Sequence, residues 1–249
     1  MPVIIYDGNG SYLFCMSTET ANLNNVIPDS RILVTSQRFA YLTDTSAFAD
    51  DMSVIRIISN DFDLALDLKR KEQNLALEDS IALDELAITL MKLSFLLPTA
   101  IIKDLNFENQ EAMNDFCRDN GYLSVSASDV FNYRNDFDVY EVSRSPLFLK
   151  SSELAQIIAF RMNNGAPEHY AIIIGEPDYS NPIIRIHTSC YTGDLLYSLS
   201  CDCRDQLHGA IDYMVNFGGG IILYLSQEGR GIGLANKIRA YNLQICSSF

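Results

Sequence analysis

The chain has 249 residues, a net charge of −14, and 48% hydrophobic against 20% charged residues. This composition is typical of a globular protein with one large domain or two of ordinary size. The strong negative charge argues against broad affinity for nucleic acid or anionic membranes. Residues 1–150 carry 12 Lys and Arg against 23 Asp and Glu, whereas residues 151–249 carry 6 against 9. The second half is therefore the better candidate for binding an anion.

The sequence shows no targeting or membrane-spanning segment. The N-terminus lacks a basic stretch followed by an apolar run, so no secretory signal is expected. The most apolar window, 86–102, contains Lys92 and Pro98 and is too short to span a membrane, so we interpret it as a buried helix. We expect a cytoplasmic protein, in which a tight cysteine cluster indicates metal binding or catalysis rather than disulfides.

The first half predicts a mixed α/β domain without a chemical motif. Its patterns predict strands at 30–35 and 52–58, helical segments between 61 and 102 with a break near residue 79, and a helix at 110–118 that stops at Asn120-Gly121. The polar stretch 134–146 is interpreted as irregular, which places a domain boundary near Lys150. The expected domains are 1–150 and 151–249.

The second half has clearer punctuation. Its patterns predict strands at 170–175, 183–187 and 221–225, and helices at 205–217 and 234–244. Between the last strand and the last helix lies the glycine-rich turn from Gly229 to Gly233. This order suits phosphate binding, because the N–H groups at a helix start point toward an anion.

Three of the six cysteines, Cys190, Cys201 and Cys203, follow the spacing C-x10-C-x-C. Thiolates are preferred Zn²⁺ ligands, and three protein ligands leave a fourth position for water, as in catalytic zinc sites. Such a water becomes a nucleophile near neutral pH. The alternative is a buried Cys190 with two incidental neighbours, but the spacing favours zinc. His187 or His208 could supply a fourth ligand, although each alone better fits a hydrogen-bonded structural role.

The motifs RIHTSCYTGDLLYSLSCDCRDQL and ILYLSQEGRGIGLANKIRAYNLQ closely resemble GTP cyclohydrolase II, over about residues 151–244. The resemblance implies a mixed α/β (α+β) catalytic domain that opens the imidazole ring of GTP and releases formate and pyrophosphate, as the first step of riboflavin biosynthesis. It also implies Zn²⁺ at the cysteines, Mg²⁺ at the phosphates, and a homodimer. Residues 1–150 are interpreted as an extension of structural or regulatory role.

Carried over by motif, the resemblance assigns three groups of site residues. The zinc ligands are Cys190, Cys201 and Cys203, and Tyr241 takes part in the ring chemistry. The nucleotide contacts are Arg185, Ile186, His187, Thr188, Ser189, Gln206, Glu228, Gly229 and Arg230. Arginines offer paired donors to phosphate oxygens, and Glu228 could accept from a guanine edge. Each residue alone has a plainer structural explanation; Lys237 and Arg239, for example, fit a solvated helix face.

Two departures from the family pattern matter. Tyr197 stands where the family commonly has Gly, and a tyrosine would be strained if the backbone there required φ > 0. The family also continues beyond R-A-Y-x-L-Q with an aspartate general base and an arginine nucleophile, which have no counterpart here. The ending, 245–249, resembles neither that continuation nor a helix end. We therefore expect truncation, with an inactive zinc- and nucleotide-binding remnant as the alternative function.

Overall fold

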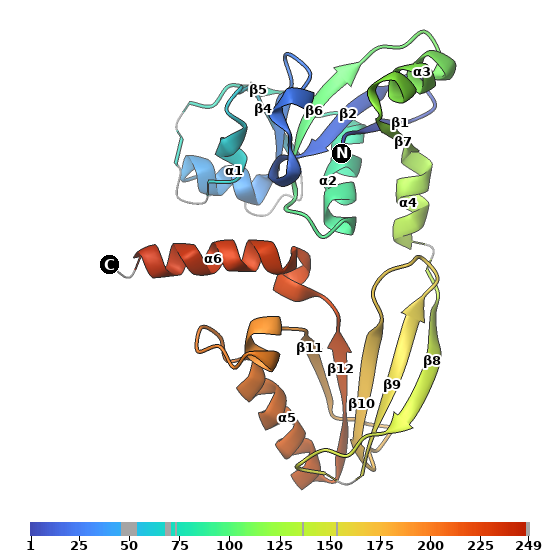
Figure 1. The fold of residues 1–249 in the computed structure, drawn as a ribbon, viewed down its shortest axis with the longest axis vertical. Coiled ribbons are helices and arrows are strands. Elements are labelled where there is room, and N and C mark those ends of the chain that lie inside the picture. The colour runs from blue at the N-terminus through green and yellow to red at the C-terminus, as the bar shows by residue number, and fades with distance from the viewer. Residues whose placement is uncertain (46–53, 68–70, 73, 136, 153, 248–249) are drawn as a thin grey trace. The chain divides into compact units, whose positions relative to one another are not determined.

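The computed structural model describes every residue except 46–53, 68–70, 73, 136, 153 and 248–249. The chain forms two compact units, residues 1–135 and 136–249 (Figure 1). The sequence placed the boundary later, near Lys150. The difference is strand β8 (Val139–Pro146), which pairs with β9 (Ala155–Met162), so the stretch interpreted as irregular belongs to the sheet of the second unit.

A seven-stranded sheet organises the first unit, in the order β5-β4-β3-β6-β2-β1-β7. Its strands are β1 (Val3–Tyr6), β2 (Tyr12–Ser17), β3 (Arg31–Thr35), β4 (Val54–Ile57), β5 (Leu77–Glu78), β6 (Thr99–Leu105) and β7 (Leu123–Ser126). Only β1 and β7 pair in parallel; the other neighbours are antiparallel. The predicted strands at 30–35 and 52–58 are confirmed as β3 and β4, although residues 52 and 53 lie outside the described part.

Helices cover both faces of this sheet. They are α1 (Ser36–Thr43), α2 (Ala82–Leu93), α3 (Gln110–Asn120) and α4 (Ala127–Asn135), with short 3-10 turns at Thr18–Thr20, Leu23–Asn25 and Phe62–Ala65. Successive strand residues point to opposite faces, so Ile5 packs with α2 while Ile4 packs with Met113 of α3. The predicted helix at 110–118 is confirmed, with Asn109 capping its start and Gly121 (φ 66°) following its end.

The prediction of helical structure throughout 61–102 is wrong in two places. In the described part of 61–78, the chain forms a 3-10 turn and the short strand β5. The long helix of this region is α2, which begins only at Ala82. After Pro98 the apolar run becomes β6, which lies in the middle of the sheet between β3 and β2. A strand buried on both faces reads as a continuous apolar run, which periodicity cannot distinguish from a buried helix.

The second unit is built on a five-stranded sheet in the order β11-β12-β10-β9-β8. Its further elements are β10 (His169–Gly175), β11 (Ile184–Thr188), the π-helical turn η4 (Tyr191–Leu195), α5 (Cys203–Phe217), β12 (Gly219–Leu225), the 3-10 turn η5 (Glu228–Gly231) and α6 (Gly233–Ser247). These elements confirm every strand and helix predicted for this half. Helix α6 continues to Ser247, so residues 245–247 are helical, contrary to expectation.

Helix α5 packs against one face of this sheet through a small apolar core. The buried members of the core are Ile174, Ile211, Met214 and Ile222. Gly218 (φ 104°) ends α5 and lets the chain turn directly into β12. Among the helices that the structure describes, none is both long and apolar enough to cross a membrane.

Candidate metal centre and nucleotide site

The topology of the second unit places the chemical motifs at one edge of its sheet. Strands β11 and β12 are parallel neighbours, with Thr188 opposite Leu225. Their carboxyl ends therefore lie side by side, which is where ligands commonly bind in α/β sheets. Cys190 follows β11 and Glu228 follows β12, so two segments far apart in sequence meet at this edge.

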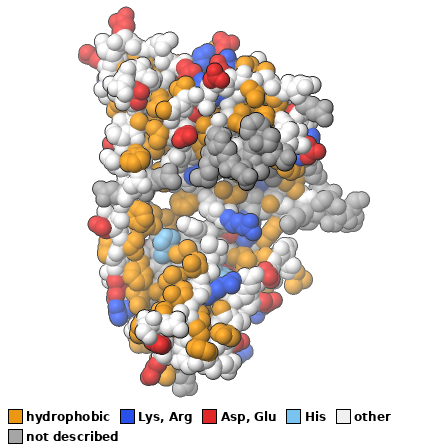
Figure 2. Space-filling model, turned by 180° about the vertical axis from the view of Figure 1, so that it is seen from behind, with side chains coloured by type: hydrophobic (Ala, Val, Ile, Leu, Met, Phe, Trp, Pro, Cys, Tyr) orange, Lys and Arg blue, Asp and Glu red, His pale blue; other side chains and the backbone are white. Residues whose placement is uncertain are grey.

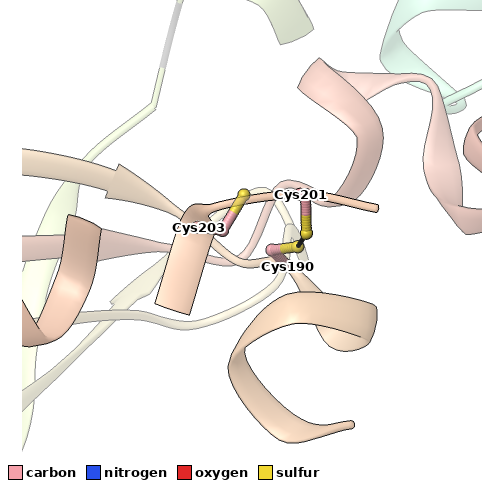
Figure 3. Close-up of side chains that lie close together, drawn as sticks. All are labelled: Cys190, Cys201 and Cys203. Atoms are coloured by element: carbon pink, nitrogen blue, oxygen red, sulfur yellow. Dashed lines mark hydrogen bonds between the residues drawn. The ribbon is translucent and has the colours of Figure 1, made fainter. Parts of the chain in front are cut away.

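Three cysteines converge there (Figure 3). The Sγ atoms of Cys190, Cys201 and Cys203 all lie within 4.8 Å of one another, and those of Cys190 and Cys201 are 3.5 Å apart. Tetrahedral Zn–S bonds of about 2.3 Å would hold sulfurs roughly 3.8 Å apart. The three thiols therefore fit a zinc ion with one position left open. In the described part of the chain, this is the only such group of possible metal ligands, and it contains no histidine.

Gly193, in the π-helical turn η4, is what allows the sulfurs to approach. A Cβ on Gly193 would lie 2.8 Å from Cys201 Sγ and 2.9 Å from Cys190 Sγ. Its N–H also donates to Cys190 Sγ at 3.2 Å. Nothing in the sequence alone indicated that this turn must lack a side chain.

Asp194 anchors the start of the cysteine loop. Its Oδ2 accepts from the Cys190 N–H at 3.0 Å and from the Tyr224 hydroxyl at 2.7 Å. The His187 ring stacks on Tyr224, and its Nε2 lies 3.4 Å from Asp194 Oδ1. His187 is buried and takes the structural role described above, while His208 is exposed on α5. Neither histidine joins the cysteine cluster.

The environment separates the acidities of the cysteines. Burial alone would raise the pKa of the Cys190 thiol, but hydrogen bonds from Lys237 Nζ, Gly193 N–H and Thr192 outweigh it and lower the pKa to about 7. Burial together with its two cysteine neighbours raises the pKa of Cys203 to about 12. One thiolate is thus available near neutral pH before any metal is bound.

Arg185 and Gln206 meet beside the cysteines, as expected for parts of one site. Arg185 Nη2 donates to Gln206 Oε1 at 2.6 Å, and Gln206 Nε2 donates to Asp202 Oδ2 at 2.9 Å. Arg185 Nε is buried without a hydrogen-bond partner. A buried guanidinium N–H without an acceptor is costly, so this position suits an added acceptor such as a phosphate oxygen.

The glycine-rich turn after β12 places Glu228 against the cysteine loop. Gly229 (φ 63°) and Arg230 (φ 59°) are both left-handed, and Arg230 is exposed. Glu228 Oε2 accepts from the Tyr191 N–H at 2.6 Å and Oε1 from Lys237 Nζ at 2.8 Å. Glu228 therefore already has two donors, and neither was foreseen from the sequence.

Helix α6 contributes two side chains to the site. The Tyr241 hydroxyl lies 3.1 Å from Thr192 Oγ1 in the cysteine loop, which places this predicted residue at the site. Lys237 Nζ lies 2.8 Å from Cys190 Sγ, and its side chain is only 15% exposed. The interpretation of Lys237 as part of a solvated face is therefore wrong. Its i, i+4 spacing to Tyr241, which puts both on one helix face, was the available signal.

The remaining predicted nucleotide contacts lie on or just after β11. Ile186 and Thr188 are exposed, and Ile186 points away from the Arg185 and His187 side of the sheet because strand residues alternate. Ser189 N–H donates to Leu225 O at 2.8 Å, which ties the two strand ends together. Of this stretch, Arg185 and His187 share the face of β12 residue Tyr224, whereas Ile186 does not.

Tyr197 adopts the strained backbone that its glycine counterpart suggested, with φ 58°. The guanidinium of Arg204 stacks on the Tyr197 ring, 3.8 Å from the ring centroid. Both residues line a cleft of about 470 Å³ that also includes Cys201. Cation–π contact contributes about 0.5–1 kcal/mol at an exposed site, which offsets part of the cost of left-handed φ, about 1–2 kcal/mol.

Comparison with known proteins agrees with the motifs. The family described as GTP cyclohydrolase II matches residues 142–248. GTP cyclohydrolase-2 of Azospirillum brasilense is 42% identical over 161 residues, which cover 64% of this chain and 42% of that protein. The Psychromonas ingrahamii enzyme of the same name is 55% identical over 92 residues, covering 36% of this chain and 46% of that protein. Riboflavin biosynthesis protein RibBA of Synechocystis is 36% identical over 170 residues, covering 64% and 30%.

The chain spans less than half the length of these curated relatives. A solved two-domain 3,4-dihydroxy-2-butanone 4-phosphate synthase from A. baumannii covers 91% of this chain and 78% of its own, with 13% identity and a TM-score of 0.40, too weak a likeness to support an argument. The matched region contains the cysteine cluster, Glu228 and Tyr241, and the predicted resemblance is confirmed: residues 142–248 match the GTP cyclohydrolase II family.

Proposed function

We propose that this chain hydrolyses GTP in a zinc-dependent reaction that opens the imidazole ring and releases formate and pyrophosphate. The product would be a diaminopyrimidinone ribosylamino phosphate, the first intermediate of riboflavin biosynthesis. The observation that carries the proposal is the meeting of the cysteine cluster with the Arg185–Gln206 pair and Glu228 at one sheet edge. The names of the relatives support the same activity.

Each group has a physical role in this proposal. Cys190, Cys201 and Cys203 hold Zn²⁺, which supplies Lewis acidity for hydrolysis near neutral pH. Arg185 and Arg230 bind phosphate oxygens, and Mg²⁺ offsets part of the negative charge of the phosphates. Residues 186–189, at the end of β11 and just after it, form the backbone beside the nucleotide. Tyr241, held by Thr192 at the edge of the cluster, faces the ring chemistry.

Glu228 and Gln206 are proposed to recognise the base or ribose, with Gly229 allowing close backbone approach. Because Glu228 already accepts from Tyr191 N–H and Lys237, recognition of guanine would use its remaining lone pairs. Burial and the bond to Asp194 raise the pKa of Tyr224, so this hydroxyl stays protonated as a donor and holds Asp194 in place.

The test is formate release from GTP by the purified chain with Zn²⁺ and Mg²⁺. Release by the parent protein, abolished in Cys201→Ser, would support the proposal. The matched control is Cys117→Ala, which removes a buried thiol of α3 in the first unit and should leave the rate unchanged. GTP binding with zinc present but without formate would overturn the enzymatic proposal and leave a nucleotide-binding protein.

We further propose a cytoplasmic homodimer. Ile184 and Ile186 of edge strand β11 are 53% and 64% exposed, on the face of the sheet opposite α5. Figure 2 shows hydrophobic side chains, in orange, at the surface of the protein. Exposed apolar surface of this kind marks association sites. Sedimentation of the parent protein and of Ile186→Asp would test this, since only the parent should form dimers.

A further inference from the structure

Lys237 occupies a position at the metal centre that neither the motif assignment nor the proposed reaction uses. Its ammonium lies 2.8 Å from Cys190 Sγ and 2.8 Å from Glu228 Oε1. The Lys237 and Glu228 side chains are 15% and 17% exposed. These contacts join three elements: α6, the loop after β11 and the turn after β12. A long charged side chain held this firmly is expected to have a specific role.

The charge of the site supplies that role. Three thiolates around a dication carry a net charge of −1, the Glu228 carboxylate beside them adds another negative charge, and burial makes an uncompensated charge costly. A cation that donates to a ligand sulfur offsets this charge and fixes the orientation of the ligand. Among the described residues of the site, Lys237 is the cation in contact with a cysteine sulfur.

We propose that Lys237 is a positioning residue that compensates the charge of the three-cysteine metal centre and joins that centre to the Glu228 turn. The inference rests on the proposed function only in requiring that the cysteines hold a metal. Glu228 Oε2 accepts from the Tyr191 N–H directly after Cys190. The chain of contacts therefore runs from sulfur to ammonium to carboxylate and back to the metal loop. Metal binding and the order of the nucleotide-binding turn are coupled through this ring.

Arg239 provides the matched control within the same helix. It is a cation two residues further along α6, and its guanidinium donates to Asn236 of the same helix at 2.8 Å. Arg239 is exposed, whereas Lys237 faces the cysteines. A loss of positive charge on α6 in general is thus separable from a loss of the charge at the sulfur.

The experiment is a competition titration of the full chain with Zn²⁺ and Co²⁺ against a chelator of known affinity. The variants are Lys237→Arg, Lys237→Met, Lys237→Glu and Arg239→Met. We expect Lys237→Met to bind metal about 10–100-fold more weakly, as is usual when a partner of a metal ligand is removed. Lys237→Glu should be weaker still, Lys237→Arg should recover most of the affinity, and Arg239→Met should match the parent.

A spectroscopic reading separates a charge effect from mere packing. The thiolate-to-Co²⁺ charge-transfer band should shift in Lys237→Met, because Cys190 Sγ loses the hydrogen bond from Lys237. The band should stay in place in Arg239→Met. Circular dichroism of the metal-free variants checks folding, and Lys237→Gln serves if Lys237→Met does not fold.

The outcomes distinguish the two proposals. If the parent and Lys237→Met bind metal with equal affinity and show the same charge-transfer band, the role of Lys237 is overturned. The proposed function would still stand. A parent that binds no metal would remove both. Graded affinities in the order of side-chain charge would support the inference directly.

Discussion

At the scale of single residues, the candidate site depends on Gly193 having no Cβ atom. Gly193 leaves space between Cys201 Sγ and Cys190 Sγ, each of which would lie under 3 Å from an added Cβ. We expect Gly193→Ala to push the sulfurs apart and to lower zinc affinity by about 10-fold or more, because second-sphere distortions typically cost 10–100-fold. Chelator competition measures this, with Gly209→Ala, where nothing lies within 4 Å, as the control. Equal affinities in both variants would show that the turn can yield.

His169 gives a residue-level pH dependence. Its Nδ1 accepts from the Ser226 N–H at 3.1 Å, and burial lowers the pKa of the ring below its usual value. Below about pH 6.5 the unfolded chain takes up a proton that the folded ring resists. Stability is therefore full above that pH and falls as the solution is acidified. Urea unfolding at several pH values should show this slope in the parent and a shallower one in His169→Asn, which keeps an acceptor without titrating. Parallel slopes would contradict the assignment.

The sequence pointed to the three cysteines and to the Q-E-G-R turn because their spacings resemble those of GTP cyclohydrolase II. Lys237 and Gly193 could not be assigned this way. Their importance depends on which face of α6 and which side of a turn point toward the sulfurs, and a single sequence does not contain that orientation. Tyr197 lies between these cases, since its positive φ was suspected from the glycine expected there.

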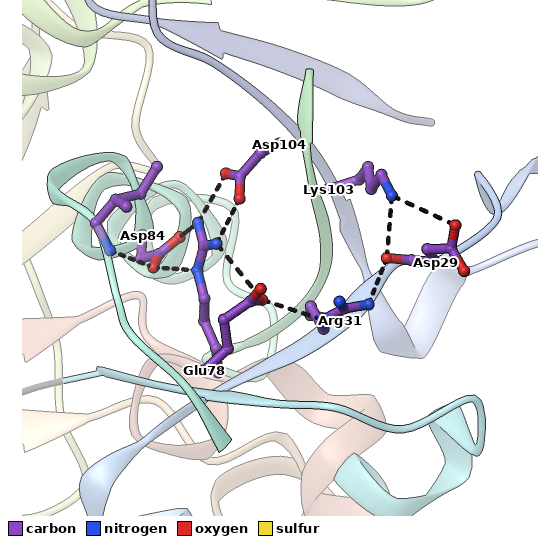
Figure 4. Close-up of polar contacts among 8 residues, drawn as sticks. Asp29, Arg31, Glu78, Asp84, Lys103 and Asp104 are labelled. Atoms are coloured by element: carbon purple, nitrogen blue, oxygen red, sulfur yellow. Dashed lines mark hydrogen bonds and ion pairs between the residues drawn. The ribbon is translucent and has the colours of Figure 1, made fainter. Parts of the chain in front are cut away.

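At the scale of elements, a buried ion-pair network ties α2 to the sheet of the first unit (Figure 4). Arg56 of β4 donates through Nε to Asp84 Oδ2 at 2.7 Å and through Nη1 to Asp104 Oδ2 at 2.6 Å. Asp84 is fully buried and also accepts from the Ile81 N–H at the start of α2. The network therefore fixes the position of a helix start, while Arg31 and Glu78 extend it toward the surface.

We expect Arg56→Met to destabilise the first unit by about 3–5 kcal/mol, because it leaves the Asp84 carboxylate buried without its cation. Arg31→Met removes a more exposed pair and should cost about 1 kcal/mol or less. Urea unfolding of each variant, with hydrogen exchange in α2 as the probe, measures both losses of stability. Similar small losses in the two variants would mean that water or another group replaces Arg56.

Elements were predictable where burial alternates or where glycine and asparagine punctuate the chain, as at α3 and throughout 170–244. Strand β8 was missed because all of its residues are exposed, so its sequence carries no apolar periodicity. Its position depends on pairing with β9 alone. Strand β6 was mistaken for helix because its first four residues, Thr99–Ile102, are buried on both faces and continue the apolar run that begins in α2. In both strands the deciding information is long-range pairing.

At the scale of the whole molecule, every proposed metal ligand belongs to residues 136–249. Bound metal stabilises only the structure that binds it, by an amount that grows with the logarithm of its concentration. We therefore expect a chelator to lower hydrogen-exchange protection in β11, α5 and β12 while the protection of β1–β7 stays the same. Exchange measured by mass spectrometry with and without Zn²⁺ tests this. Equal loss in both units would show that they unfold as one.

The parallel pairing of β11 and β12 also determines when the metal centre can form during folding. Cys190 and Glu228 come together only after the chain has crossed over through α5, so the contact between Tyr191 and Glu228 closes a span of 37 residues. Pairings this far apart in sequence are made late. Metal would then stabilise the domain after it has folded and would not nucleate its folding. Added Zn²⁺ should slow unfolding far more than it speeds folding, since interactions absent from the transition state affect mainly the unfolding rate.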